Sequence, residues 1–128
     1  FDTFNTRDPV AAAACFAEDA ELRDVAVPRA AVGRQQIAAV YARHFAAFPN
    51  AHVRIDRMVA EGNTVAVEWT LSGTHGGRLL GIPATGKPIC FQGISMIRYR
   101  NGLAVADTRM WDLAGLLRQI GLLPQHQG

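Results

Sequence analysis

Two cysteines and four histidines are few for a chain of 128 residues, and none of them has the spacing of a metal site. The sequence therefore predicts no bound metal. Cys15 and Cys90 each stand among apolar neighbours, so both are expected to be buried, reduced thiols. Any chemistry must then come from carboxylates, hydrogen bonds and the shape of a binding site.

A strong charge of either sign is also missing. The net charge is +2, and the basic residues are scattered rather than gathered with aromatic residues into a stripe, so binding to nucleic acid is not expected. No apolar run reaches the roughly 20 residues that cross a membrane, and no signal-peptide pattern is present. The chain is expected to be soluble and cytoplasmic, with no membrane partner.

A phosphate-binding glycine loop, a nucleotide fingerprint and a Ser-His-Asp order are absent as well. What the sequence has is a length and a hydrophobic content of 49% that suit one domain over residues 1–128. Asp8-Pro9 opens an alanine-rich helix predicted over residues 10–20, and Gly33 opens a second over residues 34–48. The apolar residues of the second helix fall on one face: Ile37, Val40, Tyr41, Phe45 and Phe48.

Strand signals dominate the remainder. A short strand is predicted over residues 20–27, and four more over residues 51–60, 64–75, 89–100 and 103–111. Tight turns join the first two and the last two of these four, and a loop rich in glycine and proline over residues 76–88 lies between the two pairs. A last helix is predicted from Leu113 to about Ile120. Helices followed by an antiparallel meander predict an α+β fold. A strongly curved sheet that closes over helices leaves a cone-shaped apolar hollow, where small molecules can bind.

Two aspartates are candidates for moving protons in such a hollow. Asp112 directly precedes the last helix and is well placed as its N-cap, a role worth about 1 kcal/mol that does not prevent it from lining the cavity mouth. Asp24 stands where the chain leaves a strand. It is either a loop acid exposed to water or a carboxylate at the pocket rim that takes a proton from carbon next to a carbonyl.

The hairpin around Asn101-Gly102 decides which polar side chains look inward. A two-residue turn would put Ser95 opposite Thr108, whereas a three-residue loop would put Ser95 opposite Asp107. In the second register, one face that can form the cavity wall carries Ser95, Asp107, Arg109 and Trp111. An exposed ladder of aspartate and arginine is the alternative.

Three further positions are judged from their place on strands. His75 ends a strand ahead of a glycine-rich loop, so bonding to the loop backbone competes with a role in binding substrate. Trp69 alternates with apolar residues and is expected in the core or the cavity wall. Trp69, Met110 and Trp111 together are predicted to shape the cavity.

Several stretches carry a family likeness over nearly the whole chain: FAEDAELRD, GTHGG, GIPATGK, IRYRNGL and WDLAGLLRQIG. With them the sequence resembles the SnoaL-like polyketide cyclase family, part of the ketosteroid isomerase and nuclear transport factor 2-like superfamily. The resemblance implies a cone-shaped α+β barrel, in which a curved antiparallel sheet wraps around N-terminal helices and a short C-terminal helix follows. It also implies a deep apolar pocket, no cofactor and a homodimer.

The resemblance points to individual residues too. Family members that close a polyketide ring use an aspartate and a histidine, and these positions are Arg109 and Ser95 here. An arginine stays protonated and cannot be the base, but it can hold an enolate, phenolate or carboxylate. Ketosteroid isomerases have their general base at the position of Asp24. The combination of Asp107, Arg109 and Asp112 is similar in composition to the Asp–Arg–Asp set of limonene epoxide hydrolases.

From these residues we expect a cofactor-independent enzyme that cyclises or isomerises a hydrophobic, polyketide-like carbonyl compound by acid/base proton transfer. Asp112 and Asp24 would be the acid/base groups. Arg109 with Ser95 would hold the developing negative charge, and Asp107 would orient Arg109.

Two alternatives are an epoxide hydrolase and a non-catalytic module of the same fold that binds small molecules or dimerises. An enzyme should bury at least one of Asp112 and Asp24 in the cavity, whereas a binding module can leave both in water. A homodimer would use the outer face of the sheet, provided that Ile94 and Met96 face outward.

Overall fold

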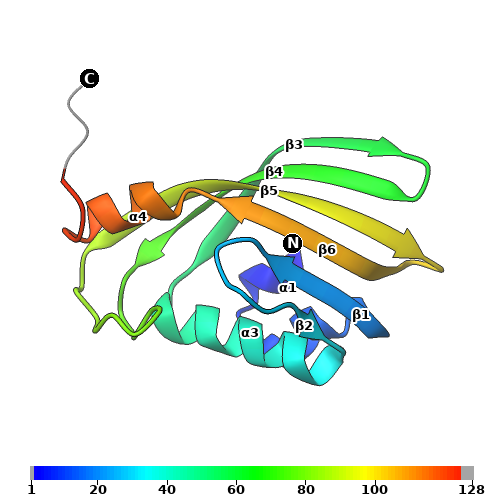
Figure 1. The fold of residues 1–128 in the computed structure, drawn as a ribbon, viewed down its shortest axis with the longest axis horizontal. Coiled ribbons are helices and arrows are strands. Elements are labelled where there is room, and N and C mark those ends of the chain that lie inside the picture. The colour runs from blue at the N-terminus through cyan, green and yellow to red at the C-terminus, as the bar shows by residue number, and fades with distance from the viewer. Residues whose placement is uncertain (1, 125–128) are drawn as a thin grey trace.

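The computed structural model describes residues 2–124, which form a curved six-stranded sheet with helices on one side of it (Figure 1). The predicted α+β fold is confirmed, with a short helix after the last strand. The elements in chain order are α1 Asp2–Asn5, α2 Pro9–Ala13, β1 Phe16–Asp24, β2 Ala31–Val32, α3 Arg34–Ala47, β3 His52–Glu61, β4 Thr64–Thr74, β5 Pro88–Arg100, β6 Leu103–Trp111 and α4 Leu113–Gln119.

The strands follow the order β2-β1-β6-β5-β4-β3. The antiparallel meander predicted from β3 to β6 is confirmed. The sequence did not indicate that β1 would pair in parallel with β6, the last strand of that meander. This pairing places the end of β1 beside the end of β6, far apart in sequence, and it determines which residues share the centre of the sheet.

The alanine-rich helix is shorter than the sequence predicts. Asp8 caps α2 as expected, because its carboxylate accepts hydrogen bonds from the backbone of Val10 and Ala11. The helix ends at Ala13, and β1 begins at Phe16, inside the segment predicted as helix. Pairing with β6 and burial of alternate side chains override the helix propensity of the alanines here. Cys15, between the two elements, is exposed, as is Cys90 on β5, so the expectation of buried thiols is wrong.

The β5–β6 hairpin combines features of both predicted registers. The turn has two residues, since Arg100 pairs with Leu103, but an irregularity next to Tyr99 then shifts the pairing by one residue. Ser95 therefore lies opposite Arg109 rather than opposite Thr108 or Asp107. Because the shift restores the alternation, the inward face carries the four residues of the second predicted register: Ser95, Asp107, Arg109 and Trp111.

Gly93 on β5 creates room for the largest side chain in the sheet. It lies between Trp69 on β4 and Trp111 on β6 in the pairing of the strands. A Cβ atom at Gly93 would overlap the indole ring of Trp69 and approach the carbonyl oxygen of Met110. The absence of a side chain at this position therefore lets the Trp69 indole lie against the backbone of β5.

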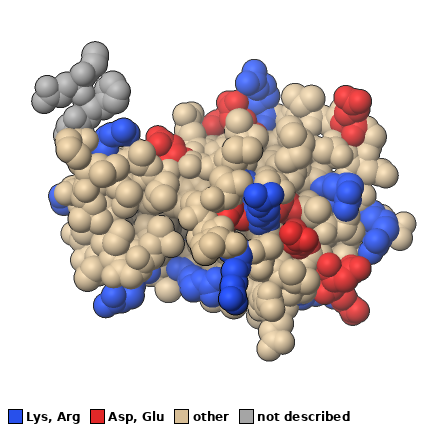
Figure 2. Space-filling view, in the orientation of Figure 1, with Lys and Arg blue, Asp and Glu red and all other residues tan. Residues whose placement is uncertain are grey.

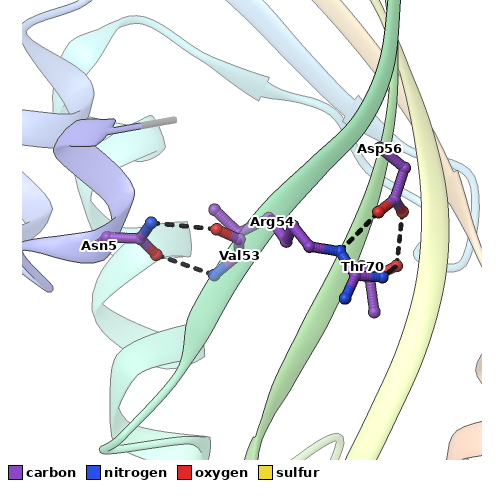
Figure 3. Close-up of polar contacts among 5 residues, drawn as sticks. All are labelled: Asn5, Val53, Arg54, Asp56 and Thr70. Atoms are coloured by element: carbon purple, nitrogen blue, oxygen red, sulfur yellow. Dashed lines mark hydrogen bonds and ion pairs between the residues drawn. The ribbon is translucent and has the colours of Figure 1, made fainter.

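Side-chain hydrogen bonds join the outer elements to the sheet (Figure 3). Asn5 at the end of α1 bonds twice to the backbone of Val53 on β3, donating to its carbonyl oxygen at 3.0 Å and accepting from its N–H at 2.8 Å. Further along β3, Asp56 accepts from Arg54 and from Thr70 of β4. These contacts hold α1 against the edge strand β3, and β3 against β4.

The surface in the view of Figure 2 has basic and acidic side chains mixed over its right-hand part and mostly uncharged residues on its left. No basic stripe crosses this face. Within residues 2–124, no helix is long and apolar enough to span a membrane.

The close approach at Gly93 predicts a strong effect of one methyl group. Gly93→Ala is expected to lower the free energy of unfolding by about 1–3 kcal/mol, because the Trp69 ring has to move out of a packed position. Gln92→Ala, at the neighbouring exposed position, should stay within about 0.5 kcal/mol of wild type. Urea denaturation of the three proteins measures both changes, and equal stability of the two variants would contradict the packing argument.

Candidate functional site

The space between the helices and the inner face of the sheet is a cavity of about 330 Å³. This volume is at the lower end of the range of small-molecule sites, roughly 300–1,000 Å³. Most of its wall is aromatic or aliphatic, from α1, the residue that follows α3, five of the strands and the loop between β4 and β5: Phe4, Phe16, Phe48, Val53, Trp69, Leu71, Leu79, Phe91, Ile97 and Trp111. The cavity thus suits a mainly hydrophobic molecule.

A row of polar side chains crosses this wall at one level of the sheet. Asp24 on β1 is the pairing partner of Arg109 on β6, and Arg109 is in turn the partner of Ser95 on β5. All three line the cavity. The row therefore offers a carboxylate, a guanidinium and a hydroxyl side by side to one bound molecule.

Asp24 is a buried carboxylate held by neutral donors. It is 8% exposed, and both of its oxygens lie 2.9 Å from the indole nitrogen of Trp111, which donates to them. The backbone N–H of Ala26 also donates to Asp24 Oδ1. Within residues 2–124, no cation forms an ion pair with this carboxylate. Asp24 Oδ2 accepts only from Trp111, so its second lone pair can still accept a proton from a molecule in the cavity.

Arg109 is held by a carboxylate and a phenol. Its Nη2 donates to Asp107 Oδ2 at 2.8 Å and to the hydroxyl of Tyr41 at 3.0 Å. Burial lowers the pKa of Arg109, but the neighbouring Tyr41 and Asp107 oxygens outweigh burial and raise it above its ordinary value. Arg109 Nε and Asp107 Oδ1 are buried without a hydrogen-bond partner among the described residues. Arg109 Nε can therefore still donate a hydrogen bond, and Asp107 Oδ1 can still accept one.

His44 on α3 lines the cavity, although the sequence did not indicate it as a site residue. Tyr41 was expected as an apolar residue only, and its hydrogen bond to Arg109 was not indicated either. Burial, then the positive charges of Arg109 and Arg43, lower the pKa of His44 to about 3. His44 is therefore neutral near neutral pH. A spacing of three residues puts His44 on the helical face that carries Tyr41, and this spacing is the signal that could have found it.

Three other predicted site residues, Trp69, Trp111 and Asp107, lie around this row. Ser95 Oγ accepts a hydrogen bond from the indole nitrogen of Trp69 at 3.0 Å, and both residues line the cavity. Trp111 lines it too, beside Asp24, and its ring lies 5.0 Å from that of Phe91. Asp107, 3% exposed, contacts Arg109 as described.

Three predicted residues lie elsewhere. Asp112 caps α4, with its carboxylate accepting from the N–H of Gly115 at 2.9 Å, and is not among the residues that line the cavity. Met110 points to the outer face of the sheet, is 61% exposed and does not shape the cavity. His75 is fully buried behind the wall, where its Nδ1 contacts the hydroxyl and backbone N–H of Thr85. The predicted bond of His75 to the loop backbone is thus present.

Metal-ligand sets are not found in the part of the chain that the structure describes, where no three or more His, Cys, Asp or Glu residues lie together suitably. The chemistry available in the cavity is proton transfer at Asp24 and stabilisation of negative charge by Arg109 and hydroxyl groups.

Comparison with protein families gives one match that spans most of the chain. The family model described as SnoaL-like polyketide cyclase matches residues 1–120. This match confirms the resemblance that the sequence motifs indicate. No curated protein matches the chain.

Solved structures support the fold. TsrD from Streptomyces laurentii is 29% identical, with 94% of this chain and 88% of that chain covered and a TM-score of 0.82. Wild-type IdmH from Streptomyces antibioticus, provisionally described as a polyketide cyclase, is 26% identical over 94% and 92% of the two chains, with a TM-score of 0.79. An LEH-like epoxide hydrolase from M. tuberculosis, 16% identical over 93% and 81%, has a TM-score of 0.71 and is similar in fold alone.

The low pKa of His44 predicts acid sensitivity. In the unfolded chain, a histidine takes up a proton below about pH 6.5, whereas folded His44 stays neutral down to a pKa of about 3. The unfolded state then binds more protons, so stability is lost as the pH falls through this window. Between about pH 6.5 and about pH 4.5, His44 should account for a loss on the order of 2 kcal/mol. Urea denaturation of wild type and His44→Gln at both pH values measures it, and parallel losses would refute the assignment.

Proposed function

The chain belongs to the SnoaL-like polyketide cyclase family, and on this premise we propose that it is an enzyme acting without a cofactor on a hydrophobic carbonyl compound. The reaction is a cyclisation or isomerisation that proceeds by proton transfer. The observation that carries the proposal is the row in which the Asp24 carboxylate, itself without an ion-pair partner among residues 2–124, stands next to the Arg109 guanidinium in an apolar cavity.

Asp24 is the proposed base. Its carboxylate takes a proton from carbon adjacent to the substrate carbonyl, the C–H bond breaks, and the electron pair moves onto the carbonyl oxygen as an enolate. In a cyclisation, the enolate carbon then attacks a second carbonyl carbon of the same molecule and forms a ring. In an isomerisation, the conjugated enolate is instead protonated at a different carbon. Asp24 returns the proton to the resulting alkoxide or carbon. The atoms balance with no oxidant or reductant.

Arg109 is the proposed site of the enolate oxygen. Both of its hydrogen bonds come from Nη2, which leaves other N–H groups of the guanidinium for the substrate. A charge-assisted hydrogen bond in a cavity with little water is strong, so negative charge that develops there is stabilised more than in solution. Asp107 and Tyr41 position Arg109. Ser95, whose oxygen accepts from Trp69, has its hydroxyl proton free to add a second hydrogen bond.

Epoxide hydrolysis is a second candidate that one observation favours. Asp107, Arg109 and Asp24 stand in one cavity, so an arginine between two carboxylates is available to polarise an epoxide oxygen while a carboxylate activates water. A purely ligand-binding role is the third candidate, supported by Arg109 and Ser95 at the positions of the family's aspartate and histidine. Both alternatives use the same cavity, but they differ in which compounds are bound and which are turned over, and the experiments below measure this difference.

Turnover after substitution of Asp24 tests the proposed reaction. A thermal-shift panel of polycyclic aromatic ketones, steroid enones and terpene epoxides first gives the ligand class, since a ligand at 100 times its Kd adds about 2.7 kcal/mol. On a ketone or enone that binds, Asp24→Asn should lose roughly 100-fold or more in kcat, the usual contribution of a positioned acid/base group.

Asp112→Asn is the matched control for that experiment. Asparagine caps a helix about as well as aspartate, so this variant should keep both its Tm and its turnover. Loss of turnover in Asp112→Asn but not in Asp24→Asn would make Asp112 the base instead. Binding of ketones with no turnover in wild type would favour the ligand-binding role, and turnover of the epoxides alone would favour hydrolysis.

A homodimer through the outer face of the sheet completes the proposal. Ile94, Met96 and Met110 are all exposed on this face and lie on two paired strands. Light scattering should give twice the chain mass for wild type and the monomer mass for the double variant Ile94→Lys, Met96→Lys, because two buried lysines per chain would have to lose their hydration. Val10→Lys, at an apolar residue exposed on α2, should leave the mass unchanged.

A further inference from the structure

The loop between β4 and β5 contains a small, well-defined turn. Leu79 and Ile82 exchange two backbone hydrogen bonds, of 3.0 and 2.7 Å, around Leu80 and Gly81. The φ angles of Leu80 and Gly81 are 49° and 81°, the left-handed values that a tight two-residue turn requires. The turn sends neighbouring side chains to opposite sides: Leu79 is 9% exposed and lines the cavity, whereas Leu80 is 54% exposed.

Several contacts fix this loop against α3. The N–H groups of Gly76 and Gly77 both donate to the carbonyl oxygen of Ala47, at 3.0 and 3.1 Å. A Cβ atom at Gly77 would overlap the backbone of Ala46, so the loop lies directly on the helix. His75 at the start of the loop contacts Thr85 near its end, so the two ends of the loop are joined. These contacts place Leu79 at the cavity wall.

The cavity has two different ends. The loop with Leu79 and the hairpin with Gly102 lie at opposite ends of the molecule (Figure 1). Gly102 and Cys15 line the cavity and are exposed, so the cavity opens to solvent on their side. Phe48 and Phe91, whose rings are 6.0 Å apart, line the cavity together with Leu79 and are buried, so the loop side is closed and apolar.

We propose that Leu79 sets the size limit of the compound that the cavity accepts, so that a ketone with two fused rings fits and one with three does not. The inference rests on the proposed function, because it has the carbonyl at Arg109 and the ring system directed at Leu79. A dry site of about 150 Å³ in a protein core takes up one benzene ring. On that scale, a cavity of about 330 Å³ holds two rings, and a third ring directed at the closed end would meet Leu79.

The test compares Leu79→Ala with Leu80→Ala, which removes the same atoms from the same turn on the exposed side. The probes are 2-acetylnaphthalene and 2-acetylanthracene, with naphthalene and anthracene as the parent hydrocarbons, and the Kd values are measured by fluorescence titration. Wild type and Leu80→Ala should bind the two-ring ketone at least 10-fold more tightly than the three-ring ketone, on the order of 1.4 kcal/mol. Leu79→Ala should abolish or reverse this preference.

A second variant keeps the proposal testable if Leu79→Ala does not fold. Leu79→Phe fills the same end of the cavity and should weaken binding of 2-acetylnaphthalene at least 10-fold. The same ranking of ring sizes in wild type and Leu79→Ala, or unchanged affinity in Leu79→Phe, would overturn the size limit, as would a failure of all four probes to bind wild type. In one outcome, Leu79→Ala changes which of the two hydrocarbons binds more tightly, but each ketone binds no more tightly than its parent hydrocarbon. The size limit then stands, and the carbonyl site of the proposed function fails.

Discussion

A guanidinium charge inside an apolar cavity is the constraint on which the rest of the site depends. Burying an ion without a partner costs several kcal/mol, so Arg109 requires a counter-ion and hydrogen-bond acceptors nearby. Asp107, two residues earlier on the same strand, supplies the first, and the hydroxyl of Tyr41 supplies another acceptor. The charge also acts on His44, whose pKa it helps to lower. Three polar residues in the cavity are thus linked through a single buried cation.

The parallel pairing of β1 with β6 adds Asp24 to this group. Without it, Asp24 would be a loop acid at the end of a strand, as one interpretation of the sequence had it. With it, Asp24 becomes the neighbour of Arg109 and the acceptor of the Trp111 indole N–H, on the inner face of the sheet. The carboxylate and the guanidinium do not form an ion pair, since Arg109 is turned to Asp107. This separation leaves one group able to accept a proton and the other able to hold negative charge.

The sequence predicts local structure correctly where a few adjacent residues decide it. Asp8 and Asp112 cap helices because an aspartate before a helix finds free backbone N–H groups within its own reach. The predicted apolar face of α3 is buried at Ile37, Tyr41 and Phe45, and at Phe48 directly after the helix, because the period of a helix fixes which residues share a side. The start of β1 and the exposure of Cys15 were predicted wrongly, because the alanines before them favour a helix and only pairing with a distant strand ends it.

By itself, the sequence determined the α+β fold, the family and an aspartate and an arginine as candidates for chemistry, since these follow from periodicity, turn residues and motifs along the chain. Only the tertiary structure decided which candidates meet. The irregularity beside Tyr99 put Ser95 opposite Arg109, the parallel pairing brought in Asp24, and the packing of α3 added His44. It also left Met110 outside and gave Asp112 to a helix end. Each of these outcomes depends on contacts between segments that are far apart in sequence, where a shift of one residue turns a side chain from the cavity to solvent.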